Sequence, residues 1–86
     1  MISVLFFAKY REQLGTAKIC IESSELAAEN LTVAELKAHL SQRGDLWATV
    51  LNAENTLCAV NQDIADSACF IREGDEVAFY PPVTGG

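Results

Sequence analysis

Apolar residues dominate the first segment of the chain and alternate between two faces. Residues 2–8 have the composition of a β-strand. One face of this strand would carry Ile2, Val4 and Phe6, and the other Ser3, Leu5 and Phe7. Because both faces are largely apolar, the strand belongs in the centre of a sheet or presents its second face to a partner.

A second alternating segment follows a short break. Residues 9–15 have the pattern of a helical turn or loop that closes at Gly15. Residues 17–23 then alternate more cleanly, with Ile19 and Ile21 pointing inward and Lys18 and Glu22 outward. We expect residues 2–8 and 17–23 to pair as antiparallel strands.

The sharpest local signal in the sequence is the start of a helix. Thr32 and Glu35 have the spacing of a capping box, and Leu31 with Leu36 fits a hydrophobic staple. The helix should therefore start at Thr32, after a polar connection. Its apolar stripe is made by Val33, Leu36 and Leu40, and Gly44 supplies a C-terminal stop.

The second half of the sequence predicts one more short helix and several strands. Residues 45–51 form the helix, with Leu46 and Val50 four positions apart. The strand segments are residues 57–62, residues 68–71 as a fourth strand and residues 77–80 as the last, with residues 72–76 as the turn before it. Pro81 and Pro82 end the last strand.

This order of elements predicts the fold class. Two strands, a main helix and further strands fit an α+β roll of the β-grasp kind, in which a mixed sheet packs on one main helix. The first and last strands would lie side by side in parallel, joined by a right-handed crossover that contains the helix. We expect one domain over residues 1–86, with residues 81–86 protruding as a flexible Gly-Gly tail.

Composition excludes several classes of protein. Twelve acidic residues against six basic ones give a net charge of −6, which argues against binding to nucleic acid. The sequence has neither a secretory signal nor a run approaching the ~20 apolar residues that cross a membrane, so we expect a cytoplasmic protein. The cysteines Cys20, Cys58 and Cys69 are odd in number and widely spaced, which favours reduced thiols over a disulfide framework or a zinc site.

The side chains do not suggest a self-contained active site. His39 is the single histidine, and its spacing from Glu35 fits an ordinary contact one helical turn apart. Ser41 projects from nearly the opposite face of the helix, so no Ser–His pair forms there. The sequence also lacks a glycine-rich phosphate loop, paired carboxylates and a metal-binding motif.

The closing segment "PPVTGG", residues 81–86, is the exception. The two prolines end the sheet and direct the following residues away from it. Gly85 and Gly86 have no side chains, so such a tip can enter a narrow tunnel. The useful group at this tip is the α-carboxylate, which adenylation would convert into an acyl donor. A frayed terminus without function is the alternative explanation.

Three stretches of the sequence resemble a known family. "MISVLFFAKYRE" (1–12), "AVNQD" (59–63) and "GDEVAFYPPVTGG" (74–86) are similar to the small, sulfur-carrying subunit of molybdopterin synthase, the MoaD family. The resemblance runs through the whole chain in order. The closing segment is specific, because other Gly-Gly carriers share the last two residues but not the run before them.

The resemblance implies a ubiquitin-like β-grasp protein that carries sulfur without being catalytic itself. On that pattern Gly86 is adenylated by a MoeB-like partner that uses ATP and magnesium, and a sulfur donor system then converts it to a thiocarboxylate. The tail, with Gly85 and Thr84 as its slim approach, enters a pocket of the large, MoaE-like subunit. There it donates sulfur to a cyclic pyranopterin monophosphate precursor in molybdenum cofactor biosynthesis. On the same pattern we expect the chain itself to bind no cofactor or metal.

The same resemblance predicts the surface that meets the partners. Phe7, Ile64 and Tyr80 match apolar contact positions of the family, and Pro81 and Pro82 lie at the root of the tail. Arg11 and the acidic pair Asp75–Glu76 are weaker candidates, for charge contacts with the activating enzyme. The assembly implied is a heterotetramer of small and large subunits.

Three other functions stay open at this point. The first is a sulfur carrier for another pathway, such as thiazole synthesis. The second is a ubiquitin-like modifier that is ligated to lysines. The third is a β-grasp interaction domain with an inert tail.

Overall fold

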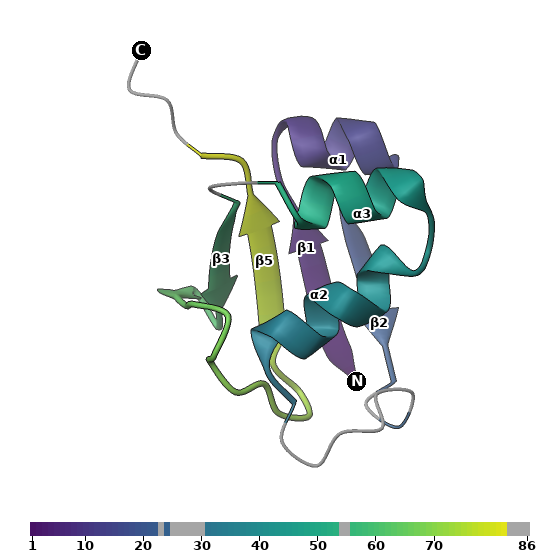
Figure 1. Cartoon of the computed structure of the whole chain (residues 1–86). Coiled ribbons are helices and arrows are strands. Elements are labelled where there is room, and N and C mark those ends of the chain that lie inside the picture. Colours follow the sequence, from purple (N-terminus) through teal and green to yellow (C-terminus); the bar gives the residue numbers. More distant parts are fainter. Residues whose placement is uncertain (23, 25–30, 54–55, 83–86) are drawn as a thin grey trace.

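The computed structural model describes residues 1–22, 24, 31–53 and 56–82, which form one sheet and three helices (Figure 1). The elements in chain order are β1 (Ile2–Phe6), α1 (Lys9–Leu14), β2 (Lys18–Ile21), α2 (Val33–Ser41), α3 (Asp45–Leu51), β3 (Leu57–Val60), β4 (Asp63–Ile64) and β5 (Glu76–Tyr80). The strands lie in the order β2-β1-β5-β3-β4.

The centre of the sheet is the pair formed by β1 and β5. These two strands run parallel, whereas β1–β2, β3–β5 and β3–β4 are antiparallel. Figure 1 shows the helices on one face of the sheet, so that the sheet has a covered face and an open face. The predicted α+β β-grasp roll is therefore confirmed, including its parallel first and last strands.

The core lies between the covered face and the helices. Ile2, Val4 and Phe6 are buried on β1, as the alternation predicts, and Val77 and Phe79 are buried opposite them on β5. The stripe of α2 packs onto the same core through Val33, Leu36 and Leu40, none of which is exposed to solvent.

The start of α2 follows the predicted capping pattern. Thr32 is the N-cap, and its hydroxyl oxygen accepts a 3.3 Å hydrogen bond from the Glu35 backbone N–H. The same hydroxyl donates a 3.4 Å hydrogen bond to the Glu35 carboxylate. Leu31 and Leu36 are both buried, as the staple requires.

The end of α2 differs from the prediction. The helix ends at Ser41, and the Gln42 N–H closes the last turn on the carbonyls of His39 and Leu40. Gly44 is not the stop of this helix; it precedes α3 as its N-cap, with a φ of 154° that favours glycine. The last turn of α2 is closed by backbone hydrogen bonds before the glycine is reached.

The inward face of α3 also differs from the prediction. Leu46 is exposed, and the helix turns Trp47, Val50 and Leu51 toward the core instead. The Trp47 ring meets Phe6 edge-on at a centroid distance of 5.4 Å, and the Arg43 guanidinium lies 4.7 Å from the Trp47 ring centre. The larger ring covers more of the core than Leu46 would, which decides the rotation of this short helix.

The fourth strand is not residues 68–71 but the two-residue strand β4. Phe70 makes only an isolated bridge to Thr32. β3 ends at Val60, two residues earlier than predicted, because Asn61 and Gln62 take positive φ angles of 51° and 72° and turn the chain back into β4. Positive φ at both central residues is the geometry of a two-residue type I′ hairpin.

The hairpin yields a prediction about stability. Replacing Gln62 by glycine should raise the free energy of unfolding by about 0.5–1 kcal/mol, because only glycine adopts a positive φ without a steric cost. The matched control is Gln13→Gly inside α1, which should lower it by about 1 kcal/mol. Urea unfolding of the two variants measures both changes. A loss of stability in both would show that the turn is not under backbone strain.

Candidate functional site

Four aromatic residues at the end of β1 and β5 form two pairs, one on each face of the sheet. Phe6 and Phe79 are opposite each other in the β1–β5 register, and both are buried in the core with their rings 6.1 Å apart. The next residues, Phe7 and Tyr80, lie on the opposite side of the sheet, where their rings are 5.3 Å apart and tilted by 40°. The predicted placement of Phe6 and Phe7 on opposite faces is confirmed, and Phe79 and Tyr80 divide in the same way.

The strand registers extend this aromatic pair into a larger apolar surface. Leu57 is directly opposite Tyr80, and the register Leu5–Ala78–Ala59–Ile64 forms a continuous row across four strands. Residues directly opposite each other in neighbouring strands share a face. The apolar face, as we call this surface, consists of Leu5, Phe7, Leu57, Ala59, Ile64, Ala78 and Tyr80.

The most exposed members of the apolar face lie at its two margins. Ile64 on the edge strand β4 is 89% exposed, Phe7 is 43% exposed and Leu57 is 40% exposed. The two alanines in the middle of the row, Ala59 and Ala78, are buried at 1% and 6% exposed, so the exposed apolar area comes from the larger side chains around them. Large exposed apolar patches on a small domain mark interaction sites. The structure thus brings Phe7, Tyr80 and Ile64 onto one face, and their role in partner contacts stays a prediction.

Sequence reasoning missed Leu57, Ala59 and Ala78 as members of this face. Alternation within residues 57–60 and 76–80 assigns each residue to one of two faces. It does not say which residue of one strand lies opposite which residue of the next. Only the register of β3 with β5 places Leu57 beside Tyr80.

The root of the predicted tail borders the apolar face. Pro81 and Pro82 follow Tyr80 directly and are partly buried. Because a proline has no N–H, neither can extend the pairing of β5. β5 ends at the same end of the molecule as α1 (Figure 1). Thr84, Gly85 and Gly86 lie outside the described residues, and their roles stay predictions.

The charged candidates are divided between the two ends of the central strands. Arg11 is exposed on α1, which follows β1, whereas Asp75 precedes β5 at the other end of the sheet. The Asp75 carboxylate is already engaged, since it accepts hydrogen bonds from the Arg72 backbone N–H at 2.7 Å and from Asn61 Nδ2 at 3.0 Å. These groups therefore do not form one charged patch.

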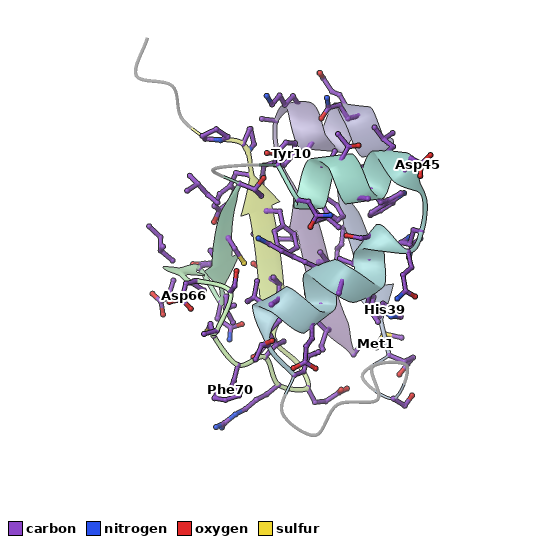
Figure 2. The ribbon with its side chains drawn as sticks, viewed as in Figure 1. Met1, Tyr10, His39, Asp45, Asp66 and Phe70 are labelled. Atoms are coloured by element: carbon purple, nitrogen blue, oxygen red, sulfur yellow. The ribbon has the colours of Figure 1, made fainter. Side chains whose placement is uncertain are left out.

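The single histidine lies on the helical side of the sheet, away from the apolar face. His39 is partly buried on α2, in the helical layer (Figure 2). In the described ranges, histidine, cysteine and acidic side chains do not gather into a group of three that would hold a metal ion. Across the same ranges, no helix has both the length and the apolar character needed to span a membrane.

The three cysteines are free thiols in three different environments. Cys20 is exposed on β2, Cys69 is partly buried and Cys58 is buried on the covered face of β3. Burial raises the pKa of the Cys58 thiol from 9.0 to about 11; the charge of Lys37 opposes this rise and Cys69 adds to it. Cys58 is therefore a protonated, unreactive core residue at neutral pH.

The Cys58 environment predicts a dependence of stability on pH. Because its pKa is higher in the folded protein, the thiol contributes stability that is complete below pH 9 and is lost as the pH rises toward 11. We expect the difference in free energy of unfolding between the wild type and Cys58→Ala to shrink over this range. Urea unfolding at a series of pH values measures it. A difference that stays constant would contradict the raised pKa.

Comparison with known proteins identifies the family. The model of the ThiS family matches residues 4–86, nearly the whole sequence. The chain belongs to the ThiS family. It is also 45% identical over 86 residues to the molybdopterin synthase sulfur carrier subunit of Escherichia coli, and this match covers 100% of both chains.

Solved structures share the fold at lower identity. The Haloferax volcanii small archaeal modifier protein 1 matches with a TM-score of 0.77 at 19% identity, covering 95% of this chain and 97% of that one. A chain from the complex of subunits 1 and 2 of the molybdopterin-converting factor of Helicobacter pylori matches with a TM-score of 0.64 at 23% identity, covering 99% of this chain and 97% of that one. Both likenesses support a ubiquitin-like β-grasp fold.

Proposed function

We propose that this member of the ThiS family is the sulfur carrier subunit of a molybdopterin synthase, with sulfur carried on Gly86. The observation behind the proposal is the full-length identity of 45% to the E. coli subunit of that name. The family match also extends to residue 86, so the Gly-Gly segment is part of the matched domain.

The chemistry begins with activation of a carboxylate. The Gly86 carboxylate attacks the α-phosphorus of ATP, which releases pyrophosphate and leaves an acyl adenylate. Hydrosulfide released by a sulfur donor system then attacks the acyl carbon, AMP departs, and a thiocarboxylate remains. This sulfur then bonds to a carbon of the cyclic pyranopterin monophosphate precursor, and an oxygen substituent of that carbon departs. Water cleaves the acyl–sulfur bond and regenerates the carboxylate. Two such transfers supply the two sulfurs of a dithiolene.

The described residues fit a carrier that relies on its partners for catalysis. Within these ranges, His39 lies on α2 in the helical layer. Cys58 is opposite Phe79 near the end of β5, but its thiol is buried on the covered face of the sheet. Pro81 and Pro82 separate the sheet from the Gly-Gly segment. Two residues without side chains allow the carboxylate to enter a partner's active site with little steric hindrance.

The apolar face is the surface that we assign to the large synthase subunit. The related H. pylori protein was solved in a complex of subunits 1 and 2 of its converting factor. An apolar surface beside the root of the tail lets one docking event both bind the carrier and direct Gly86 into the partner's pocket. We infer a heterotetramer of two small and two large subunits.

Activation requires a second partner, an adenylating enzyme that supplies ATP and magnesium. We place this cycle in the cytoplasm, where ATP is available. Arg11 is the charged residue that we assign to this contact, because it is exposed at the end of the molecule where β5 leads into the tail. Arginine suits such a role because its guanidinium binds carboxylates in a fixed geometry.

The tail gives a direct test of the proposed function. Deleting Gly86, or adding one residue after it, should abolish sulfur transfer while the fold is retained, because the acyl carbon no longer reaches the reacting groups. The assay combines the chain with the large subunit, the adenylating enzyme, ATP, magnesium, a sulfur source and the precursor. Intact mass measures replacement of one oxygen by sulfur in the wild type, and circular dichroism checks the fold.

The other outcomes of this assay identify the competing functions. Full activity of the extended chain would overturn the proposal. Sulfur loading that is used only by a thiazole synthase would assign the chain to another pathway, and covalent conjugates to lysines of other proteins would assign it to the modifiers.

The apolar face gives a second test. Phe7→Ala and Ile64→Ala should each weaken binding to the large subunit about tenfold, as expected for exposed apolar anchors of an interface. The matched control is Phe70→Ala, which removes an aromatic residue that is 61% exposed. Phe70 lies on the loop before β5, away from the apolar face, and its backbone forms an isolated β-bridge with Thr32 (Figure 2). Calorimetric titration measures all three. Equal losses at Phe70 and Phe7 would show that this face has no special role.

A further inference from the structure

The position of Ile64 depends on the backbone of its hairpin rather than on its side chain. The side chain is 89% exposed, so contacts with the rest of the protein do little to fix it. Its strand, β4, has two residues and pairs with β3 only through Ala59–Ile64 and Val60–Asp63. One further hydrogen bond, from the Ala65 N–H to the Cys58 carbonyl at 2.9 Å, follows the strand.

Beyond the pairing of β3 with β5, Asn61 ties the turn of this hairpin to the start of β5. Its Nδ2 donates to Asp75 Oδ1 at 3.0 Å, and its Oδ1 accepts from the Glu76 N–H at 3.0 Å. Its own N–H donates to the Glu76 carbonyl at 2.7 Å. Asp75 is held in turn by the Arg72 N–H at 2.7 Å. The turn of the β3–β4 hairpin is thus tied to the first residue of β5.

This attachment joins the two parts of the apolar face. β5 carries Ala78 and Tyr80, whereas the hairpin carries Ile64. The turn also needs a positive φ of 51° at its first position, which asparagine tolerates better than most residues do. One side chain therefore both permits the turn and adds two hydrogen bonds that hold the turn against the start of β5.

We propose that Asn61 is a positioning residue of the docking surface: through Asp75 and Glu76 it holds the β3–β4 hairpin so that Ile64 meets the large subunit in the same rigid surface as Tyr80. This inference rests on the proposed function. A preorganised contact avoids the loss of conformational entropy that a mobile hairpin would suffer on binding. Asn61 acts on binding through Ile64 and need not touch the partner.

The test is a double-mutant cycle on the full chain with purified large subunit. Asn61→Gly keeps the positive φ accessible and removes both side-chain hydrogen bonds. We expect it to weaken binding about fivefold when Ile64 is present and less than about twofold in an Ile64→Ala background. In a Phe7→Ala background it should keep its full effect, because Phe7 does not depend on the hairpin.

A control and a rescue separate positioning from a general loss of stability. Tyr10→Phe removes the 2.9 Å hydrogen bond to Thr56, which lies at the opposite end of the sheet from the Asn61 turn (Figure 2). This variant should leave binding unchanged. The exchange Asn61→Asp with Asp75→Asn restores one donor and one acceptor across the same pair and should recover affinity. Asn61→Asp alone should bind weakly, since two carboxylates then face each other.

Each outcome decides between the alternatives. Coupling between positions 61 and 64, with rescue by the exchange, supports the positioning role. Equal weakening by Asn61→Gly in the wild-type and Ile64→Ala backgrounds, or no weakening, overturns it while the proposed function stands. A wild-type chain that does not bind the large subunit overturns the proposed function and this inference together.

Discussion

The parallel pairing of β1 with β5 is the constraint on which the other features depend. It brings Phe6 and Phe79 together in the core, where each buried ring contributes about 2–3 kcal/mol through the hydrophobic effect. The same register places the following residues, Phe7 and Tyr80, together on the opposite side. A parallel pair also needs a long crossover, which is why α2 and α3 cover one face of the sheet and leave the other open. The core, the Phe7–Tyr80 pair and the position of the tail root thus depend on a single strand pairing.

Much of this arrangement was predictable from the sequence because it depends on local signals. The alternation in residues 2–8, the cap at Thr32 and the prolines after Tyr80 act over a few positions, and each has the expected effect in the structure. The errors share a different cause. The facing of α3 depends on how Trp47 fills a space next to Phe6, and β4 depends on positive φ angles at Asn61 and Gln62. Such features are decided by tertiary packing and by hydrogen bonds to distant residues.

The candidate site divides in the same way. Phe7 and Tyr80 follow from strand alternation, and the Gly-Gly segment follows from composition at residues 85 and 86. Leu57 belongs to the site only because the register of β3 with β5 places it opposite Tyr80, and no short stretch of sequence predicts that register. Asn61 is hidden for a similar reason, because its partners Asp75 and Glu76 are 14 and 15 positions away in the chain. A surface assembled from four strands is a property of the fold rather than of any motif.

The assembly of the apolar face from separate strands has a consequence for quality control. Its residues come from β1, β3, β4 and β5, so the surface exists only after the central strand pair has closed. Folded and unfolded copies have the same Gly-Gly sequence. A partner discriminates between them if it binds the apolar face before it accepts the tail. Misfolded copies would keep the Gly-Gly segment but would lack the apolar face that the partner binds. Proofreading of the carrier is then built into its recognition, without a separate enzyme.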